Sequence, residues 1–527
     1  MRFVQRQVAE GRGVWLALLV MLVLALPGFF TLPPVDRDEV LFSQASRQML
    51  ASGDFVDIHF GDAPRYKKPV GIYWAQSAVA AVTGAVVPGA SDQIWTYRLV
   101  SLMAALLAVG FTHATARLFL NPEAALLAAV ALAASLMLGA EAHLAKTDAT
   151  LLATVAACQY LLSRALVAGR LALPLALGFW AALAASALVK GPIGPMVLAF
   201  TLVGVCLMRR DLSLWRAMRP LPGVALLVLL AAPWFVAISY VSHGAFWSAS
   251  LGRDMFEKLA TGKENHGWPP GSYLAMVWLT FWPAAMPLAA ALPAIWRGRR
   301  GELVQFALLW LVPTWVVFEA TATKLVHYTL PTYPALALLL GFAWQKKGRS
   351  ALWPAVLPGL LPVALLAALV WQAGQMDSSL PVWFWISSVG VLASIVLIVL
   401  AARGTDALRL AVALAAGSLA LNSAIYPTLA GIAPLWPARP LAAYAAAHPE
   451  CDFTVAGYAE PSLVFLTNNR VRFQDAVALP ATLAAPGCHV LAMPAGKAPP
   501  GLQALGVVKG LDLGTGHKVD LEVWLKP

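Results

Sequence analysis

The sequence predicts an all-α polytopic membrane protein of about 13 transmembrane helices, followed by a small α/β domain. Hydrophobic residues make up 60% of the chain and charged residues only 12%, whereas soluble domains carry about 25% charged residues. Mean hydropathy is +0.72. Apolar runs of about 20 residues, long enough to cross a hydrocarbon core of about 30 Å, recur down to about position 430. We therefore expect a transmembrane domain over 1–435 and a separate domain over 436–527.

The apolar runs define the expected spans, and the basic residues between them define their direction. Lys and Arg accumulate in cytoplasmic loops, and the first run follows Arg2, Arg6 and Arg12. That run is longer than a signal-peptide core and lacks a convincing cleavage site, so we take it as the first span. The expected spans are approximately 14–32, 95–119, 122–140, 149–168, 171–189, 191–208, 221–241, 272–293, 303–322, 325–343, 351–371, 381–402 and 408–430.

The arginines and lysines fall in alternate loops, which supports an inside N-terminus. Those expected in the cytoplasm are Arg164, Arg170, Arg209, Arg210, Arg216, Arg219, Arg297, Arg299, Arg300, Lys346, Lys347, Arg349, Arg403 and Arg409. This distribution explains the net charge of +11 by membrane topology and argues against a nucleic-acid partner. An odd number of spans places the domain after about 435 outside the cytoplasm.

The first outward segment contains two stretches with helical spacing of apolar residues. One runs from Asp38 to Ser52 and stops at Gly53-Asp54, and the other runs from Ile72 to Val82. Both are too short to span a bilayer, so we expect interfacial helices with amphipathic faces against the membrane. In the tail, the apolar runs 453–456, 488–492 and 521–525 alternate with Pro and Gly turns, which is typical of a small α/β domain.

The four cysteines match no zinc or haem spacing. Cys158 and Cys206 fall inside spans, where a thiol packs as a small apolar group. Cys451 and Cys488 share the C-terminal domain, and a disulfide between them is one of two alternatives if this domain lies outside the cytoplasm.

Ionisable side chains gather in the segments expected outside, close to the membrane, where their cost marks them as candidates for function. Each group could instead have a purely structural role, because acids favour helix N-termini and lysines at span ends extend towards the headgroups. If the outward loops converge, they form a pocket in which cations neutralise a phosphate leaving group and a carboxylate activates an acceptor hydroxyl. The candidates are residues 36–39, Arg65, Tyr66, Lys67, Lys68, Glu141, His143, Lys146, Asp148, Lys190, residues 263–266, Lys324, His327 and Tyr328.

Five of these segments resemble the bacterial aminoarabinose transferases that modify lipid A, whose wider relatives are the protein O-mannosyltransferases of the GT-C architecture. The resemblance covers about 1–430. The segments are Asp-Arg-Asp-Glu at 36–39 with Phe42 to Met49, Lys68-Pro69 with Tyr73-Trp74, Lys146-Thr147-Asp148-Ala149, Lys190-Gly191-Pro192, and Lys324 to Tyr328 with Leu330-Pro331 and Tyr333-Pro334.

The resemblance implies a fold, a substrate and residue roles. It implies an inverting glycosyltransferase in the bacterial inner membrane that takes a sugar from a polyprenyl-phosphate donor at the periplasmic face. Asp38 and Asp148 would be the first-loop and second-loop acids, and we group Glu39 with them as a catalytic candidate. Lys68 would hold the lipid phosphate. We assign the remaining donor-phosphate and substrate contacts to Arg65, Tyr66, Lys67, Lys190, His266, Lys324, His327 and Tyr328.

One position departs from the family pattern. The aminoarabinose transferases have a metal-associated Glu directly before the Lys-Pro pair, and Lys67 stands there in this chain. We therefore expect no metal ligand at this position and a second positive charge in its place. No other cofactor is expected, since nothing resembles a Gly-rich phosphate loop.

The sequence leaves the acceptor open between lipid A, another glycolipid, a polysaccharide and a protein hydroxyl. The expected partners are the lipid-linked donor, this acceptor and membrane lipids, and the expected state is a monomer. The main alternative is a transporter or flippase of a lipid-linked saccharide. Such proteins usually show internal repeats and helices broken at mid-membrane, and this sequence shows no sign of either feature. A structural scaffold would not explain an ordered set of ionisable outer residues.

Overall fold

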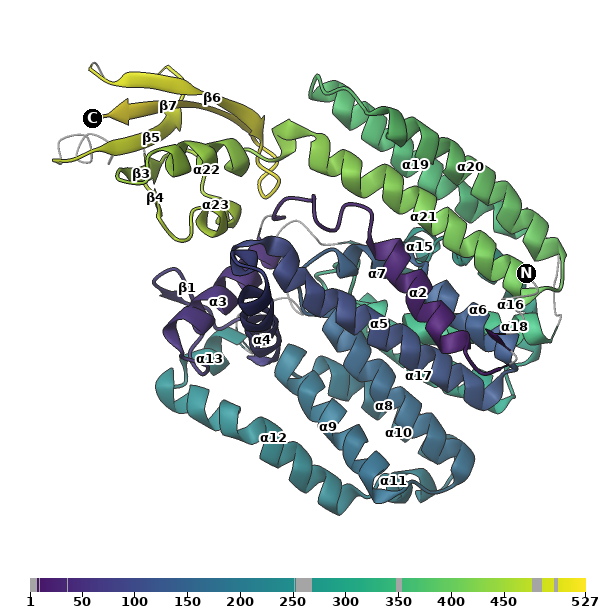
Figure 1. The fold of residues 1–527 in the computed structure, drawn as a ribbon. Coiled ribbons are helices and arrows are strands. Elements are labelled where there is room, and N and C mark those ends of the chain that lie inside the picture. The colour runs from purple at the N-terminus through teal and green to yellow at the C-terminus, as the bar shows by residue number, and fades with distance from the viewer. Residues whose placement is uncertain are drawn as a thin grey trace.

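The computed structural model is a bundle of long helices with a small sheet domain placed at one end (Figure 1). It describes residues 7–8, 10–35, 37–250, 252, 268–346, 353–475, 486–496 and 501–527. Asp36 and residues 263–266, which include the predicted site residue His266, lie outside the described residues. The side of the bundle that carries the sheet domain and the first loop is called the site side below.

The membrane domain consists of helices that follow the predicted apolar runs. Within the described residues, eight of them are long and apolar enough to cross a membrane, and a bent pair would raise the number to nine. The predicted count of 13 is therefore not confirmed. The eight are α5 (Ile94–Phe119), α8 (Asp148–Ala168), α9 (Leu173–Lys190), α12 (Pro220–Val241), α17 (Glu302–Ala320), α19 (Trp353–Gln375), α20 (Val382–Arg403) and α21 (Ala407–Gly431).

The remaining apolar runs form helices that are short or broken. Two are short apolar helices, α2 (Gly13–Ala25) and α10 (Ile193–Arg209). The run expected at 325–343 begins with a turn, so that α18 covers only Tyr333–Gln345. The short elements η1 (Ala90–Asp92), α11 (Ser213–Ala217), α13 (Ala245–Trp247), η4 (Leu330–Thr332) and η5 (Ala433–Leu435) connect the longer helices.

Two predicted spans are broken, so the sequence-based expectation of unbroken helices, used above against a transporter, is wrong for these two, and the two breaks contact each other. The run at 122–140 divides into α6 (Pro122–Ala133) and α7 (Leu136–Ala142), which are bent by 59°. The run at 272–293 divides into α15 (Ser272–Thr280) and α16 (Ala285–Arg297). The N–H of Leu136 donates to the carbonyl of Trp282 at 3.0 Å. Each break thus satisfies a backbone group that the other leaves open, as irregular backbone inside a membrane requires.

Helices form over both stretches predicted in the first loop, as α3 (Asp38–Ser52) and α4 (Gly71–Val86), with the two-residue strands β1 (His59–Phe60) and β2 (Ala63–Pro64) between them. The expectation that α3 presents an amphipathic face to the bilayer is wrong. Its buried residues include Ser43, Gln44, Ser46 and Arg47 as well as the apolar ones. Polar groups on several faces are buried because α3 packs between α4 and the C-terminal domain, where they find protein partners.

A fully buried ion pair anchors the start of α3. Arg98 of α5 donates through Nε and Nη2 to the two carboxylate oxygens of Glu39, each at 2.8 Å. Glu39 also accepts the backbone N–H groups of Val35 at 2.8 Å and Ala145 at 2.9 Å. Arg98 donates further to the carbonyls of Leu32 and Pro33. Because both charges are fully hydrogen-bonded, their burial is compensated.

The C-terminal domain is a five-stranded sheet with two helices, which agrees with the predicted α/β fold. The strand order is β4 (Val471–Phe473), β3 (Asp452–Val455), β5 (His489–Pro494), β7 (Lys518–Lys526) and β6 (Gln503–Leu511). β3 is parallel to β4 and β5, whereas β7 is antiparallel to β5 and β6. Its apolar core includes residues of α22 (Ala438–Ala447) and α23 (Pro461–Leu466).

The C-terminal domain docks on the first loop through an arginine of α3. Arg47 Nη1 donates to the carbonyl of Phe465 at 3.0 Å and to Asn468 Oδ1 at 3.2 Å, and its guanidinium lies 4.2 Å from the centre of the Phe465 ring. Figure 1 shows α23 next to α3. The two segments are joined by contacts between residues more than 400 positions apart in the chain.

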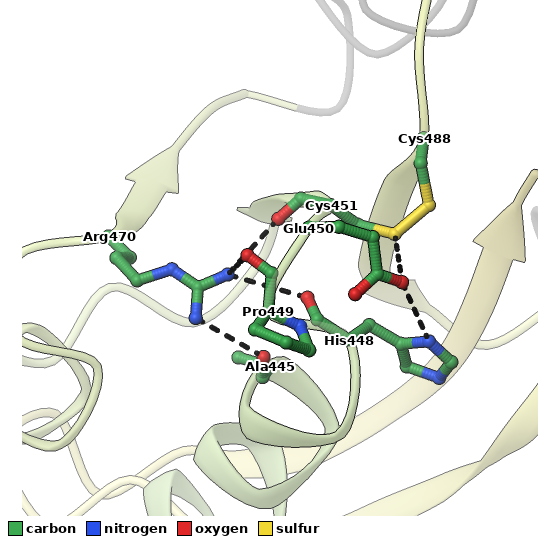
Figure 2. Close-up of a disulfide and its surroundings, with 7 residues drawn as sticks. All are labelled: Ala445, His448, Pro449, Glu450, Cys451, Arg470 and Cys488. Atoms are coloured by element: carbon green, nitrogen blue, oxygen red, sulfur yellow. Dashed lines mark hydrogen bonds and ion pairs between the residues drawn. A yellow bond between two sulfur atoms is a disulfide. The ribbon is translucent and has the colours of Figure 1, made fainter.

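A disulfide joins Cys451 and Cys488, which decides between the two alternatives left by the sequence. The two cysteines directly precede β3 and β5, so the disulfide ties these neighbouring parallel strands together at their N-terminal ends. Figure 2 shows the guanidinium of Arg470 pointing at backbone carbonyls of the segment between α22 and β3. Arg470 Nη2 donates to the carbonyl of Pro449 at 2.8 Å and to that of Cys451 at 3.3 Å.

We expect Arg98→Met to destabilise the protein by about 3–5 kcal/mol, because it leaves the buried Glu39 carboxylate without its cation. The check is the midpoint of thermal unfolding in detergent, with Arg117→Met, an exposed arginine near the other end of α5, as the control. The double variant Arg98→Met/Glu39→Gln should recover part of the loss. Equal midpoints for Arg98→Met and Arg117→Met would contradict the anchoring role.

Candidate functional site

A cluster of charged groups forms where three broken or terminating helices meet on the site side. Glu141 lies in the last turn of α7, Asp148 is the first residue of α8, and Lys190 is the last residue of α9. His327 comes from the turn that precedes η4. The bend between α6 and α7 directs Glu141 towards this cluster, and it is buried there together with Asp148.

The two carboxylates alternate with cations. Lys146 Nζ lies 3.1 Å from Glu141 Oε1, and Lys190 forms an ion pair with Asp148. The His327 ring bridges both acids, with Nδ1 3.7 Å from Glu141 Oε1 and Nε2 3.6 Å from Asp148 Oδ2. Burial opposes the charge on Lys146, but Glu141, Asp148 and Asp38 together raise its pKa above the usual value. Lys146 therefore stays protonated at physiological pH.

Three of these groups are of the kinds that bind a divalent metal. Glu141, Asp148 and His327 each offer one ligand atom, and these atoms lie within 4.8 Å of one another. Each carboxylate, however, is already paired with a lysine, and an ammonium group at that distance repels a metal cation. The donor set does not fit a metal. A second trio, formed by His448, Glu450 and Cys451, does not fit either because the sulfur of Cys451 is in the disulfide.

A cavity of about 560 Å³ adjoins this cluster, and we call it the lysine cavity. Among the described residues, its lining contains Lys67, Lys68 and Lys190 and no carboxylate. Its wall is mainly apolar and includes Leu151, Ile193, Phe235, Phe246 and Phe318. Lys190 belongs to both sites, since it lines the cavity and pairs with Asp148.

The tyrosine predicted beside the lysines is also part of the lysine cavity. Tyr328 lines it, and Lys190 Nζ lies 5.4 Å from the centre of the Tyr328 ring, a cation–π distance. The cavity thus combines cations at one part of its wall with apolar surface over the rest. This arrangement suits an amphiphile that carries an anionic group on an apolar chain.

Asp38 lies beside the cluster rather than inside it. It is the first residue of α3 and is exposed, and its charge acts on Lys146. Its position is fixed by Glu39, whose carboxylate binds Arg98 and the N–H of Ala145, one residue before Lys146. The prediction of Glu39 as a catalytic acid does not agree with this geometry, because its oxygens are buried and occupied.

The other predicted residues divide between the cavity wall and the surrounding structure. Arg65 is buried, with its guanidinium 5.0 Å from the centre of the Phe42 ring, and it does not line the lysine cavity. Tyr66 makes an edge contact with Phe246, and burial together with Asp57 raises the pKa of Tyr66 to about 12. Lys324 is buried and donates to the carbonyl of Thr321 at 2.7 Å, so it stabilises the turn before His327.

Glu141 and Lys146 are among the ionisable candidates of the sequence, but the sequence assigns them no role at the site. The signal was a carboxylate at the end of an otherwise apolar run, five residues before a lysine. The predicted site set also omitted Arg98, a lone charge near the start of an apolar run, and the aromatic cavity wall formed by Phe235, Phe246 and Trp247. The spacing of these aromatics is typical of a membrane-interface belt, so the sequence gave no separate signal for them.

Comparisons with known proteins agree with this fold. The family described as dolichyl-phosphate-mannose-protein mannosyltransferase matches residues 67–236. The undecaprenyl phosphate-α-4-amino-4-deoxy-L-arabinose arabinosyl transferase of Pseudomonas paraeruginosa is 27% identical over 359 residues, which are 64% of this chain and 61% of that protein. The corresponding transferase of Edwardsiella ictaluri is 27% identical over 353 residues, which are 64% of this chain and 60% of that protein.

Solved structures extend the likeness to nearly the whole chain. The crystal structure of ArnT from Cupriavidus metallidurans bound to undecaprenyl phosphate superimposes with a TM-score of 0.77 at 20% identity and covers 97% of both chains. The oligosaccharyltransferase of Archaeoglobus fulgidus superimposes with a TM-score of 0.51 at 10% identity, over 87% of this chain and 64% of that one.

The solved structures show that the chain shares the polytopic fold of these membrane proteins. The predicted resemblance to the aminoarabinose transferases is confirmed by the similarity of the curated relatives. The match to the Pseudomonas paraeruginosa transferase spans less than two thirds of that protein's length.

We expect the purified protein, after dialysis against chelator-treated buffer, to contain far less than a stoichiometric amount of zinc or manganese by mass-spectrometric metal analysis. The reason is the lysine paired with each carboxylate. The double variant Lys146→Gln/Lys190→Gln removes both ammonium groups and should bind more of either metal. A stoichiometric metal in the wild type would show that the lysines do not exclude it.

Proposed function

We propose that this protein is a membrane glycosyltransferase that moves a sugar from a polyprenyl-phosphate donor to an acceptor on the site side of the membrane. The lysine cavity carries the proposal. Its apolar wall suits the prenyl chain, and its three lysines suit the phosphate, whose charge grows as the sugar leaves.

The relatives support the nature of the donor. The matching transferases are named for undecaprenyl phosphate-linked 4-amino-4-deoxy-L-arabinose, and the superimposed ArnT structure contains undecaprenyl phosphate. A donor with the same lipid carrier would place its phosphate near Lys68 and Lys190. In this proposal the sugar then faces the neighbouring cluster of Glu141, Asp148 and His327.

The proposed reaction is a single displacement with inversion. An oxygen of the acceptor forms a bond to the anomeric carbon while the bond from that carbon to the phosphate oxygen breaks, and the electron pair stays on the polyprenyl phosphate. Lys68 stabilises this leaving group, with Lys67 and Lys190 as further cations. Asp148 holds Lys190 in place through their ion pair. An acceptor hydroxyl gives its proton to Asp38, whereas a phosphate acceptor is already anionic and has no proton to lose.

The side of the membrane and the acceptor belong to the proposal as well. We place the site in the periplasm because the ends of the bundle away from the site carry the basic loops and because the C-terminal domain holds a disulfide, which persists in oxidising compartments. Lipid A is the proposed acceptor, on the resemblance to the aminoarabinose transferases.

The test of this function is mass spectrometry of the envelope glycolipids of cells that lack the protein. We expect a sugar-sized mass to disappear from lipid A, and the wild-type gene to restore it. The Lys68→Ala variant should lower transfer at least about 100-fold. The control is Lys346→Ala, at an exposed lysine after α18, which should restore the lipid A sugar as fully as the wild type. An unchanged lipid A together with no accumulated lipid-linked sugar would contradict the transferase function.

Asp38→Asn separates the two kinds of acceptor. For a hydroxyl acceptor we expect a loss of about 100-fold or more in kcat, the range of a lost general base, and for a phosphate acceptor a much smaller one. The measurement is transfer by purified protein to each acceptor, with Asp62→Asn, an exposed acid of the same loop, as the matched control. Equal losses with both acceptors would remove Asp38 from proton transfer.

A further inference from the structure

A second cavity lies between the first loop and the C-terminal domain, and the proposed reaction does not use it. Its volume is about 550 Å³, similar to that of the lysine cavity. Arg37 lines it from the first loop, Tyr458 and Glu460 from the segment after β3, Phe473 and Gln474 from the end of β4, and Asp512 from the turn between β6 and β7. We call it the tail cavity.

The tail cavity begins next to the predicted catalytic acid. Arg37 and Asp38 are consecutive, so their Cα atoms are about 3.8 Å apart. Arg37 has left-handed backbone geometry, with φ of 64°, and its Nε lies 3.9 Å from Glu460 Oε1. Asp38 also acts on Lys146 of the charged cluster. It therefore lies between the tail cavity and the cluster that adjoins the lysine cavity.

The wall next to Arg37 is closely packed. A Cβ on Gly514 would lie 2.4 Å from Arg37 Nε and 2.3 Å from Glu460 Oε1. The turn between β6 and β7 therefore presses against this ion pair. Asp512, in the same turn, accepts the N–H groups of Gly514 at 2.8 Å and Thr515 at 3.1 Å. The C-terminal domain thus supplies most of the wall of the tail cavity, and the first loop closes it at Arg37.

The chemistry of the lining differs from that of the lysine cavity. Among the described residues, the acids Glu460, Asp475 and Asp512 face the fixed cations Arg37 and Lys518, so the tail cavity has no excess of positive charge to hold a phosphate. Carboxylates accept hydrogen bonds, guanidinium and ammonium groups donate them, and an amide does both. This mixture matches the hydroxyl groups of a sugar, each of which donates and accepts.

Aromatic rings complete the match to a sugar. Phe473 lines the tail cavity and is 37% exposed, and Tyr458 lines it as well. An exposed ring in a polar cavity offers an apolar surface on which the C–H face of a sugar ring can pack. The wall of the tail cavity is much less apolar than that of the lysine cavity, so a prenyl or acyl chain fits the lysine cavity better.

We propose that the tail cavity binds a sugar ring of the acceptor and delivers the neighbouring acceptor oxygen to Asp38. This inference rests on the proposed function, which it extends by naming the acceptor site. The donor is assigned to the other side of Asp38, because the lysine cavity holds the cations and the apolar wall that a polyprenyl phosphate needs. The two cavities share no described lining residue.

The test is steady-state transfer by the full-length protein, with lipid A as acceptor and undecaprenyl-phosphate-linked aminoarabinose as donor. We expect Phe473→Ala and Gln474→Ala each to raise the KM for lipid A by about 5-fold to 10-fold, where tenfold corresponds to about 1.4 kcal/mol. The KM for the donor should stay within about twofold of the wild type. The matched control is Arg472→Ala, which directly precedes Phe473 in β4, pairs with Asp452 and is outside the lining.

The possible outcomes separate failure of the acceptor-site inference from failure of the transferase function. Unchanged acceptor KM values, in variants whose thermal unfolding midpoints equal that of the wild type, would overturn the inference but leave the transferase function intact. A rise in the donor KM instead would assign the sugar in the tail cavity to the donor and would also overturn it. If the wild type transfers no sugar from this donor or from other polyprenyl-phosphate-linked sugars, the proposed function itself fails, and this inference fails with it.

Discussion

The buried pair of Glu39 and Arg98 is the interaction on which the arrangement of the site depends. It joins α3 to α5, and through the N–H of Ala145 it also fixes the turn that carries Lys146 and leads to Asp148. Two charges are stable in this apolar setting only because every acceptor and donor is used. As a consequence, Asp38, the residue directly before Glu39, is held at the edge of a cluster formed by distant parts of the chain.

Charge compensation governs the cluster itself. Glu141 and Asp148 would repel each other if they were buried alone, but Lys146 pairs with Glu141, Lys190 pairs with Asp148, and the His327 ring bridges the two acids. Lys190 has a second task, because its ammonium group also lines the lysine cavity. The network therefore couples the cavity that suits a lipid phosphate to the acids beside it. A metal would be redundant there, since the lysines already supply the positive charge.

The C-terminal domain completes the site side of the molecule. Arg47 ties α23 to α3, the disulfide and Arg470 fix the entry into its sheet, and the turn after β6 packs on Arg37 and Glu460. These contacts explain why α3 buries polar residues that would otherwise face headgroups. They also bring Arg37 of the first loop to the edge of the tail cavity, whose other lining residues belong to the C-terminal domain.

The sequence by itself determined the class of the fold and most of the polar residues near the site. Hydropathy and basic loops identify the membrane helices because a bilayer requires long apolar segments, and the segments around Asp38, Lys68, Asp148 and Lys190 established the likeness to lipid-linked-sugar transferases. Only the tertiary structure showed that Glu39 is an anchor and that Glu141 and Lys146 belong to the cluster. It also divided the runs at 122–140 and 272–293, because a break becomes stable only when another segment supplies the missing hydrogen bond. Pairings such as Arg37 with Glu460 join residues more than 400 positions apart, and local sequence patterns carry no signal for contacts of that kind.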